Sequence, residues 1–196
     1  MDGHWIIGVD EAGRGPVIGP LVVGALAIPS GDIDELSKMG VKDSKEIPSH
    51  KRVRISEQIT QTIEQGRWKS GLIVCKPSRI DINSISSDLN SLEIELFSEA
   101  ISATKLFTQS GVIRADACDV SEERFRSRLA SCLGDDWKEW NIEAEHGMDS
   151  KDVVAGGASI IAKVARDLAI EEISARTGID VGSGYPSDQT TRIAVE

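Results

Sequence analysis

Cysteine is scarce in this chain of 196 residues, and its few copies form no recognisable pattern. Cys75, Cys118 and Cys132 are odd in number, and none of them belongs to a Cys-x-x-Cys motif. Disulfide frameworks and zinc sites need paired or clustered cysteines, so the sequence indicates neither. We expect three buried thiols in a reducing compartment.

Long apolar runs are missing as well. The longest apolar stretch, Pro20 to Ile28, is too short to span a bilayer. The first residues, Met1 to His4, lack the basic segment and apolar run of a secretion signal. We therefore expect a cytoplasmic protein without a membrane partner. Low-complexity linkers and internal repeats are also lacking, so residues 1–196 are expected to form a single domain.

Positive charge is in the minority. The chain has 22 Lys and Arg against 32 Asp and Glu, and its formal net charge is -10. A uniformly acidic surface would repel the phosphates of a nucleic acid. The basic side chains cluster, however, in three segments, Lys42–Lys45, Lys51–Arg54 and Lys163–Arg166. This distribution allows a local basic strip on an acidic body.

Apolar periodicity predicts a mixed α/β fold. Strands are expected near residues 5–7, 17–28, 68–75, 112–116 and 140–144, and the first two should pair as neighbours. Helices are expected at 49–65, 87–107, 121–133 and 153–175, followed by a short last helix that Ser187 or Asp188 caps. The order predicts a mixed five-stranded sheet flanked by helices.

Two of these helices carry further expectations about which residues are buried and how closely the helix packs. Phe107 should lie on the buried face of the helix near 87–107, and Leu168 on the buried face of the helix near 153–175. Gly156 and Gly157 weaken the first turns of the latter helix. They would also let it lie very close to a strand or a ligand.

Unusual chemistry is concentrated in the stretch from Gly8 to Pro16. Its adjacent carboxylates, Asp10 and Glu11, repel each other unless a cation, a proton or an arginine lies between them. They start on opposite faces of an extended chain, so both reach one site only if the backbone turns there. Glycines 13 and 15 permit such a turn.

Two interpretations of the pair compete. In the first, it is a solvated turn with Arg14 as a surface partner. In the second, it binds a hard divalent cation, and the backbone amides of Gly13, Arg14 and Gly15 face a phosphate or a sugar. Apolar sequence on both sides favours the second interpretation, because it would bury the surroundings of the carboxylates.

Further carboxylates follow predicted elements. Asp116 ends the strand near 112–116, and Asp149 follows the strand near 140–144. Together with the first pair they give four acidic ligands, which suit two Mg²⁺ or Mn²⁺ ions. Asp119 is assigned a structural role as a helix cap. His146 is expected to face solvent, since oxygen-rich sites for hard ions rarely need histidine.

Taken in order, the motifs of the chain resemble type 2 ribonuclease H in its archaeal form. The residues that carry this resemblance span almost the whole chain: Gly8 to Pro16, Val41-Lys42-Asp43-Ser44-Lys45, Asn90-x-Leu92-Glu93, Asp116-Ala117-Cys118, Glu145-His146-x-x-Asp149, Ala158 to Asp167 and Gly184 to Asp188. Each motif is weak alone, but the set is specific. The resemblance implies an RNase H-like fold and a catalytic site of Asp10, Glu11, Asp116 and Asp149.

The resemblance also implies a two-metal-ion reaction. Asp10 would bridge both ions, Asp149 would complete the site of the ion that activates water, and Glu11 with Asp116 would hold the other ion, which stabilises the leaving 3′ oxygen. The implied substrates are RNA/DNA hybrids and duplex DNA that contains embedded ribonucleotides. Cleavage would occur on the 5′ side of the ribonucleotide and leave 3′-hydroxyl and 5′-phosphate ends.

Ribose recognition requires groups that sense the 2′-hydroxyl. By resemblance these are Gly13, Arg14, Gly15 and Tyr185. The alternative for Tyr185, the single tyrosine of the chain, is a ring that only packs on the rim of a loop. A further set of residues looks like contacts to backbone phosphates, or support for such contacts: Lys42, Ser44, Lys45, Lys163 and Arg166. For the loop that contains the first three, composition alone favours lysines that are merely solvated.

Some features depart from the family pattern. Asp152 adds a negative charge where an uncharged, often aromatic, residue is expected. The chain ends soon after Asp188, whereas family members usually continue into a helix or tail that aids duplex binding or carries a clamp-binding peptide. We therefore expect reduced duplex affinity and no sliding-clamp binding. Separately, the protein is expected to be a monomer.

Two alternatives are considered. Type 3 ribonuclease H shares the fold, but Asp149 and Arg14 argue against it. A non-catalytic module that binds hybrids is disfavoured by the complete set of four carboxylates.

Overall fold

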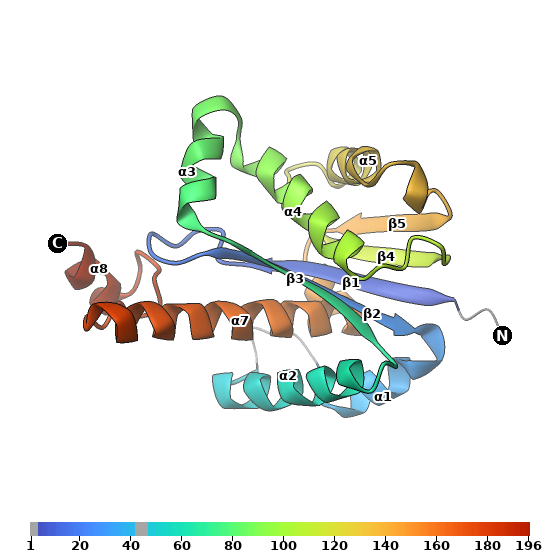
Figure 1. Cartoon of the computed structure of the whole chain (residues 1–196), viewed down its shortest axis with the longest axis horizontal. Coiled ribbons are helices and arrows are strands. Elements are labelled where there is room, and N and C mark those ends of the chain that lie inside the picture. Colours follow the sequence, from blue (N-terminus) through green and yellow to red (C-terminus); the bar gives the residue numbers. More distant parts are fainter. Residues whose placement is uncertain (1–3, 42–46) are drawn as a thin grey trace.

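The computed structural model describes residues 4–41 and 47–196 and forms a mixed five-stranded sheet with helices on both faces (Figure 1). Its elements are β1 (Trp5–Ala12), β2 (Leu21–Pro29), η1 (Ser30–Asp32), α1 (Ile33–Lys38), α2 (Ser49–Glu64), β3 (Lys69–Cys75), α3 (Pro77–Ser86), α4 (Leu89–Ala103), β4 (Gly111–Asp116), α5 (Glu122–Leu133), η2 (Asp135–Trp137), β5 (Trp140–Glu145), α6 (Met148–Lys151), α7 (Val153–Thr177) and α8 (Gln189–Val195). Three of the predicted phosphate contacts, Lys42, Ser44 and Lys45, lie outside the described residues.

The strand β1 lies at the centre of the sheet, whose order is β3-β2-β1-β4-β5. It pairs antiparallel with β2 and parallel with β4, and β4 pairs parallel with β5. The expected pairing of the first two strands is therefore confirmed. In the parallel register Val9 lies opposite Ala115, so the next residue of each strand is a carboxylate. The carboxyl ends of β1 and β4 thus bring acidic residues to the same edge.

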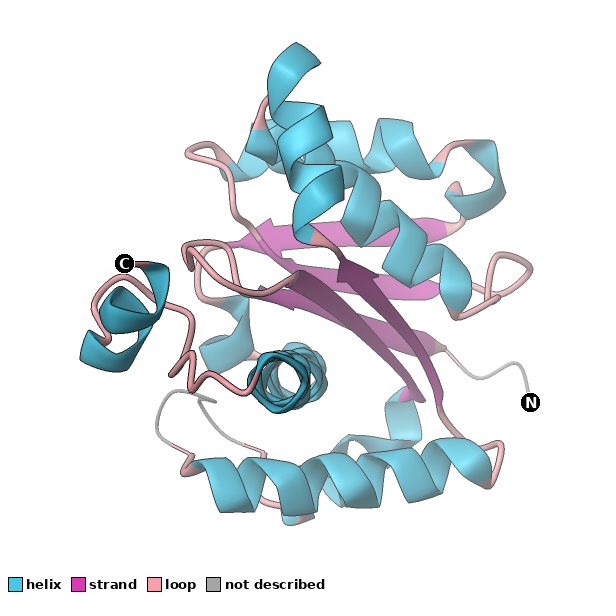
Figure 2. Ribbon diagram, turned by 60° about the vertical axis from the view of Figure 1, so that its left-hand side comes forward, coloured by secondary structure: helices cyan, strands magenta, loops and turns pink. Residues whose placement is uncertain are grey.

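Successive side chains of β1 enter two different apolar layers. Ile7 and Val9 belong to the layer that α4 and α5 cover, whereas Ile6 belongs to the layer of α2 and α7. This alternation follows from the two-residue period of a strand. Figure 2 shows helices on both sides of the twisted sheet. The period then places Asp10 on the α7 face and Glu11 on the α4 face.

The long helix α7 packs directly on the backbone of the sheet. A Cβ atom added to Gly8 would lie 2.2 Å from the carbonyl carbon of Val154, and one added to Gly157 would lie 2.6 Å from Leu26 Cδ2. Side chains at either position would push the helix off the strands. The expectation that small residues let this helix approach a strand closely is confirmed. The approach brings the first half of α7 next to the end of β1.

Some elements differ from the sequence-based expectation. The helices α1 and α3 were not expected, and α3 contains no buried residue, so it has no apolar stripe to reveal it. The strand β1 continues to Ala12, and β2 begins at Leu21. The helix α4 ends at Ala103, two residues before Lys105 adopts a left-handed φ of 58°. Phe107 therefore lies beyond the helix and is exposed.

Other single-residue expectations are wrong in part. Leu168 is 58% exposed although Arg166 and Ile170 on either side of it are buried, so α7 packs through another face at this turn. Of the three cysteines, Cys75 is buried, Cys118 is half-buried and Cys132 is exposed on α5. Cys132 is exposed although Leu129 and Leu133 of the same helix are buried, so it lies on the outer face of α5.

Helix caps are resolved by their hydrogen bonds. Ser121, not Asp119, caps α5 by accepting from Arg124 N, while Asp119 is buried and pairs with the Arg124 side chain. Asp188 caps α8 by accepting from Thr190 N, which selects it over Ser187. Among the described residues, none of the helices combines the length and the apolar composition that a membrane crossing requires.

Candidate active site

Three carboxylates meet at the carboxyl edge of the central strands. Asp10 on β1, Asp116 at the end of β4 and Asp149 on α6 each offer an oxygen atom within 4.8 Å of the others. Asp10 is 4% exposed and Asp149 is 3% exposed, whereas Asp116 is half-buried. We call these three residues the carboxylate cluster. It joins residues 139 positions apart in sequence.

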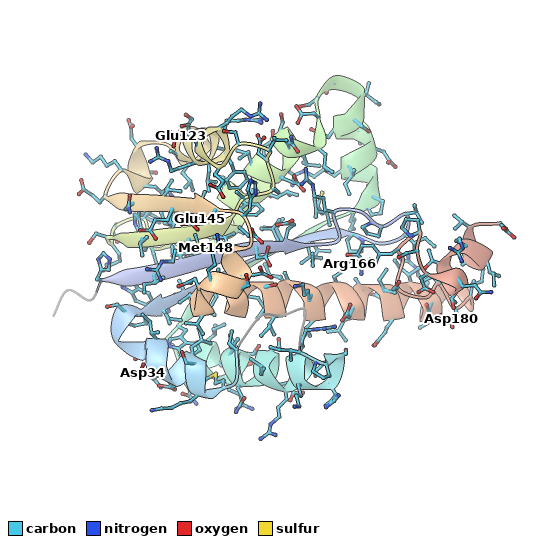
Figure 3. The ribbon with its side chains drawn as sticks, turned by 180° about the vertical axis from the view of Figure 1, so that it is seen from behind. Asp34, Glu123, Glu145, Met148, Arg166 and Asp180 are labelled. Atoms are coloured by element: carbon cyan, nitrogen blue, oxygen red, sulfur yellow. The ribbon has the colours of Figure 1, made fainter. Side chains whose placement is uncertain are left out.

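A glycine turn between β5 and α6 closes the cluster. Gly147 has a left-handed φ of 68°, which favours glycine at this position. The backbone N–H groups of Gly147 and Met148 donate to Asp116 Oδ1 at 2.7 and 3.3 Å. These bonds fix the Asp116 carboxylate against the start of α6, which carries Asp149. In Figure 3, Met148 lies close to Glu145, where the chain leaves β5.

Asp152 is not part of the cluster. Its Oδ1 atom accepts from the N–H groups of Val154 and Ala155, each at 2.9 Å, so it is the N-cap of α7. Its other oxygen pairs with the Arg114 guanidinium. The additional negative charge therefore has a structural explanation, and Asp149 is the residue of this turn that faces Asp10 and Asp116.

Glu11 lies on the opposite side of β1 from the cluster. The strand continues through Ala12, so the turn expected at the acidic pair comes only afterwards, at Gly13. Strand alternation then directs Glu11 toward α4, where Glu93 is its neighbour. Its own N–H donates to Asp10 Oδ1 at 2.8 Å. The structure thus brings three of the four predicted carboxylates within 4.8 Å of one another and leaves Glu11 beside them.

Burial makes the two carboxylates of β1 difficult to ionise. The pKa of Asp10 is raised to about 7, mainly by burial and further by the charges of Asp116 and Asp149, against a Ser159 hydrogen bond and the Lys163 charge that lower it. Burial, followed by the charge of Asp10, also holds the pKa of Glu11 well above its usual range. A cation placed between these oxygens would relieve the repulsion.

The donor set suits a hard divalent cation. Its ligating atoms are carboxylate oxygens, which Mg²⁺ and Mn²⁺ prefer. Lys163 supplies a positive charge nearby, since its Nζ atom lies 3.8 Å from Asp149 Oδ2 and donates to Ser159 Oγ at 2.9 Å. His146 is exposed, as expected, and its Nδ1 atom lies 3.0 Å from the Ala117 carbonyl oxygen.

A groove of about 440 Å³ extends from β1 along α7. Its lining residues are Glu11, Ala12, Gly13, Arg52, Lys163, Arg166, Asp167 and Tyr185. Four of the residues predicted to bind substrate therefore gather on one groove. Arg52 was not singled out from the sequence, although it belongs to the basic segment Lys51–Arg54. It pairs with Asp167 at 3.2 Å and thereby ties α2 to α7 at the groove wall.

Arg166 supports the groove from below. It is 4% exposed, its guanidinium lies 4.6 Å from the centroid of the Tyr185 ring, and its Nη2 atom donates to the Ser183 carbonyl at 2.9 Å. The cation stacked on the aromatic face stabilises the position of Tyr185. Figure 3 shows Arg166 along α7, away from Met148. The observed contacts of Arg166 are thus with Tyr185 and Ser183, and its predicted role toward the phosphates stays a prediction.

The two glycines that flank Arg14 differ in what surrounds them. Gly13 has a φ of 95°, and a Cβ atom added there would lie 2.5 Å from the Pro20 carbonyl oxygen. Gly15 is exposed, its φ is not left-handed, and a Cβ atom added there would meet nothing within 4 Å. The fold therefore requires glycine at position 13, whereas nothing in the described protein requires it at position 15.

The side chain of Arg14 is bound to the protein. Its Nη1 atom donates to the Cys118 carbonyl and its Nη2 atom to Asn90 Oδ1, both at 2.6 Å. Its Nε atom lies 3.0 Å from Glu93 Oε1 in an ion pair. Asn90 and Glu93 were part of a sequence motif without an assigned role. The signal that could have identified Glu93 from the sequence is an acidic residue on the apolar face of this helix.

Comparisons with known proteins identify the family of this chain. The family model described as Ribonuclease HII matches residues 7–196. Ribonuclease HII of Methanocella arvoryzae is 43% identical over 187 residues, which cover 95% of this chain and 78% of that protein. Ribonuclease HII of Pyrococcus furiosus is 40% identical over 185 residues, which cover 94% of this chain and 77% of that protein.

Solved structures give the same result for the fold. The ribonuclease H2 of Pyrococcus horikoshii superposes with a TM-score of 0.83 at 36% identity, over 97% of this chain and 85% of that chain. A chain in the structure of the PCNA:RNase HII complex from Archaeoglobus fulgidus matches with a TM-score of 0.83 at 35% identity. The match covers 97% of this chain and 84% of that chain. An RNase HIII in complex with Mn²⁺ shares only the fold, at 20% identity and a TM-score of 0.77, over 94% of this chain and 59% of that one.

Proposed function

The chain belongs to the ribonuclease HII family and is a ribonuclease H, and we propose that it cleaves both RNA/DNA hybrids and duplex DNA with embedded ribonucleotides. In the second substrate the cut lies on the 5′ side of the ribonucleotide and leaves 3′-hydroxyl and 5′-phosphate ends. The observation that carries this proposal is the buried carboxylate cluster beside a groove that contains Gly13 and Tyr185.

Asp10, Asp116 and Asp149 are the proposed metal ligands, with Glu11 as the fourth. Their carboxylate oxygens fit two Mg²⁺ or Mn²⁺ ions. The positive charge of such ions would offset the repulsion between the carboxylates. Such ions, when bound, would lower the pKa of the attacking water and stabilise the leaving 3′ oxygen. Lys163, held by Ser159 and lying 3.8 Å from Asp149, balances part of the remaining charge.

The turn from Gly13 to Gly15 is the proposed reader of the 2′-hydroxyl, together with Tyr185. Two observations support this assignment. The Arg14 side chain is occupied within the protein, which leaves the backbone of the turn for a ligand. The open space around Gly15 allows a sugar to approach that backbone closely. The Tyr185 hydroxyl, in the groove that Gly13 also lines, would donate or accept the second hydrogen bond.

The groove also offers a path for the phosphate backbone. Lys163 lines it between the carboxylate cluster and Tyr185, and a lysine of this kind binds a phosphate as a point charge. Arg52 contributes positive charge from α2, although Asp167 partly offsets it. This local arrangement explains how a chain of net charge -10 can bind a polyanion. We further propose that the chain acts in the cytoplasm as a monomeric single domain.

The decisive experiment uses a labelled DNA duplex with one ribonucleotide, the same duplex without it, and an RNA/DNA hybrid. Cleavage is measured with Mg²⁺, with Mn²⁺ and with a chelator, for the wild type and for Asp10→Asn. We expect one cut 5′ of the ribonucleotide, cleavage of the hybrid, no cleavage of the all-DNA duplex, and loss of both activities with the chelator or the variant. Binding of the hybrid by Asp10→Asn should persist.

The result separates the alternatives. Binding of the hybrid without cleavage under any metal condition would indicate a non-catalytic hybrid-binding module. Cleavage of the hybrid without cleavage at the single ribonucleotide would retain the ribonuclease H activity and remove the proposed substrate range.

A further inference from the structure

A fully buried carboxylate holds the side chain at the tip of the Gly13–Gly15 turn. Glu93 on α4 has 0% exposure, and its Oε1 atom lies 3.0 Å from Arg14 Nε. Arg14 itself is half-exposed, so the pair joins the surface turn to the interior of the α4 layer. The connection spans 79 positions in sequence and therefore depends on tertiary packing.

The position of Glu93 is costly for the fold. Its neighbours on α4, Leu92, Ile94 and Leu96, are buried apolar residues of the same helix. Removing a carboxylate from water is unfavourable by several kcal/mol unless the charge is paired, and an apolar residue of similar volume is often neutral or stabilising at such a site. Burial accordingly raises the pKa of Glu93, against the opposing effects of Cys118 and the Arg14 charge. Stability alone does not account for an acidic residue here.

The geometry around Arg14 accounts for it. The guanidinium is held from three sides, by the Cys118 carbonyl, Asn90 Oδ1 and Glu93 Oε1. The first two are neutral acceptors, and Glu93 adds the charge that makes the contact strong and the side chain stationary. Because Arg14 lies between Gly13 and Gly15, fixing its side chain also fixes the backbone amides on either side. Displacements of about 1 Å at such contacts reduce rates by roughly a hundredfold.

We propose that Glu93 is a positioning residue for ribose recognition, which acts through Arg14 to hold the Gly13–Gly15 backbone against the 2′-hydroxyl. This inference rests on the proposed function of the turn. Glu93 touches neither the sugar nor the reacting phosphate. Its effect is on the preference for a ribonucleotide over a deoxyribonucleotide, rather than on binding of the duplex as such.

The test is the ratio of two dissociation constants, for an all-DNA duplex and for the same duplex with one ribonucleotide, measured with Ca²⁺ and again with a chelator. Glu93→Gln removes the charge and keeps the shape of the side chain, and Arg14→Gln removes the other partner. Glu95→Gln is the matched control, since Glu95 lies on the exposed face of the same helix. Melting temperatures of all variants are measured alongside.

We expect the ratio to fall about tenfold in Glu93→Gln and in Arg14→Gln, as for the loss of one charged contact. The double variant should lose no more than either single variant, and Glu95→Gln should match the wild type. A purely structural role would lower the melting temperature or both affinities together and leave the ratio unchanged, which would overturn the inference. If Glu93→Gln does not fold, Arg14→Gln decides alone, because its change lies on a half-exposed side chain. A wild-type ratio near one would overturn the proposed function itself, and with it this inference.

Discussion

The carboxylate cluster and the Gly13–Gly15 turn begin only three residues apart on the chain, yet they are held in opposite ways. In the cluster, Asp10, Asp116 and Asp149 lie within 4.8 Å of one another, and burial and mutual repulsion raise the pKa of Asp10. In the turn, the Arg14 side chain is satisfied by three partners, and Gly13 fits against Pro20 without spare room. The surrounding fold holds the carboxylates of the cluster together against their repulsion, whereas the turn is stabilised by its own contacts.

The carboxylate cluster and the turn meet different physical requirements. A site for cations is unfavourable until the cation arrives, so the rest of the fold must hold it in place. A surface that distinguishes two sugars by one hydroxyl must be rigid before the substrate arrives. We therefore expect substitutions in the cluster to abolish activity without loss of stability, and substitutions in the turn to change stability or discrimination.

The largest effect is expected from the acidic residues of the turn before α7. Asp149→Asn should lower the cleavage rate by roughly a thousandfold or more at unchanged melting temperature, because it removes a proposed metal ligand. Asp152→Asn should retain activity within a few-fold, since asparagine also caps helices. It should lower the free energy of unfolding by about 1 kcal/mol, because the ion pair with Arg114 is lost. An inactive Asp152→Asn beside an active Asp149→Asn would show that the wrong residue was assigned to the cluster.

A second prediction concerns the stability of the metal-free protein. The folded pKa of Asp10, about 7, exceeds the unfolded value of 3.8, so its contribution to stability is complete below about pH 4 and is lost as the pH rises through 7. In a chelator, Asp10→Asn should therefore melt at a higher temperature than the wild type at pH 8, by roughly 5 °C, and the gap should close toward pH 4. Mg²⁺ should stabilise the wild type more than the variant. Equal melting curves at pH 8 would contradict the repulsion described for the cluster.

The two glycines of the turn give a matched pair. Gly13→Ala should destabilise the protein by about 2 to 4 kcal/mol, because its φ is left-handed and the added Cβ atom would clash with Pro20 and Arg166. Gly15→Ala should change stability by less than about 0.5 kcal/mol and weaken binding of the single-ribonucleotide duplex several-fold. Urea unfolding and fluorescence anisotropy measure the two quantities. If Gly15→Ala bound this duplex as tightly as the wild type, the backbone at position 15 would not face the sugar.

A further prediction concerns Tyr185, which lines the same groove as Gly13. Tyr185→Phe keeps the ring on Arg166 and removes the hydroxyl, so cleavage at a single ribonucleotide should slow by roughly one to two orders of magnitude. Tyr185→Ala should be slower still, because the stacking surface is lost as well. Long hybrids should be affected less, since many registers are available. Equal rates for all three proteins, measured when chemistry limits the rate, would remove Tyr185 from ribose recognition.

Much of the fold was accessible from local pattern. The five strands, the pairing of the first two and the long helices followed from periodicity, because each element buries a regular apolar stripe. The short helices α1 and α3 did not, since α3 buries nothing that a pattern could reveal. The exposure of Phe107, Leu168 and Cys132 was also missed, because it depends on where α4 ends and on which faces of α7 and α5 pack against the rest of the protein.

The order of motifs in the sequence predicted the family, which the comparisons confirm, and it singled out the acidic residues proposed for the site and the glycines around Arg14. These features depend on residue type and order, so they can be recognised without knowledge of the packing. Strand alternation predicted that Asp10 and Glu11 start on opposite faces, but the position of the turn after Ala12 was not evident from the sequence.

The tertiary structure alone decided which of these residues meet. The parallel pairing of β1 with β4 brings Asp10 to Asp116, and the glycine turn at Gly147 adds Asp149 and leaves Asp152 to cap α7. The packing of α4 beside the end of β1 gives Arg14 its partner Glu93. Contacts of this kind join residues that are 31 to 139 positions apart, and only the docking of whole strands and helices against one another fixes such distances.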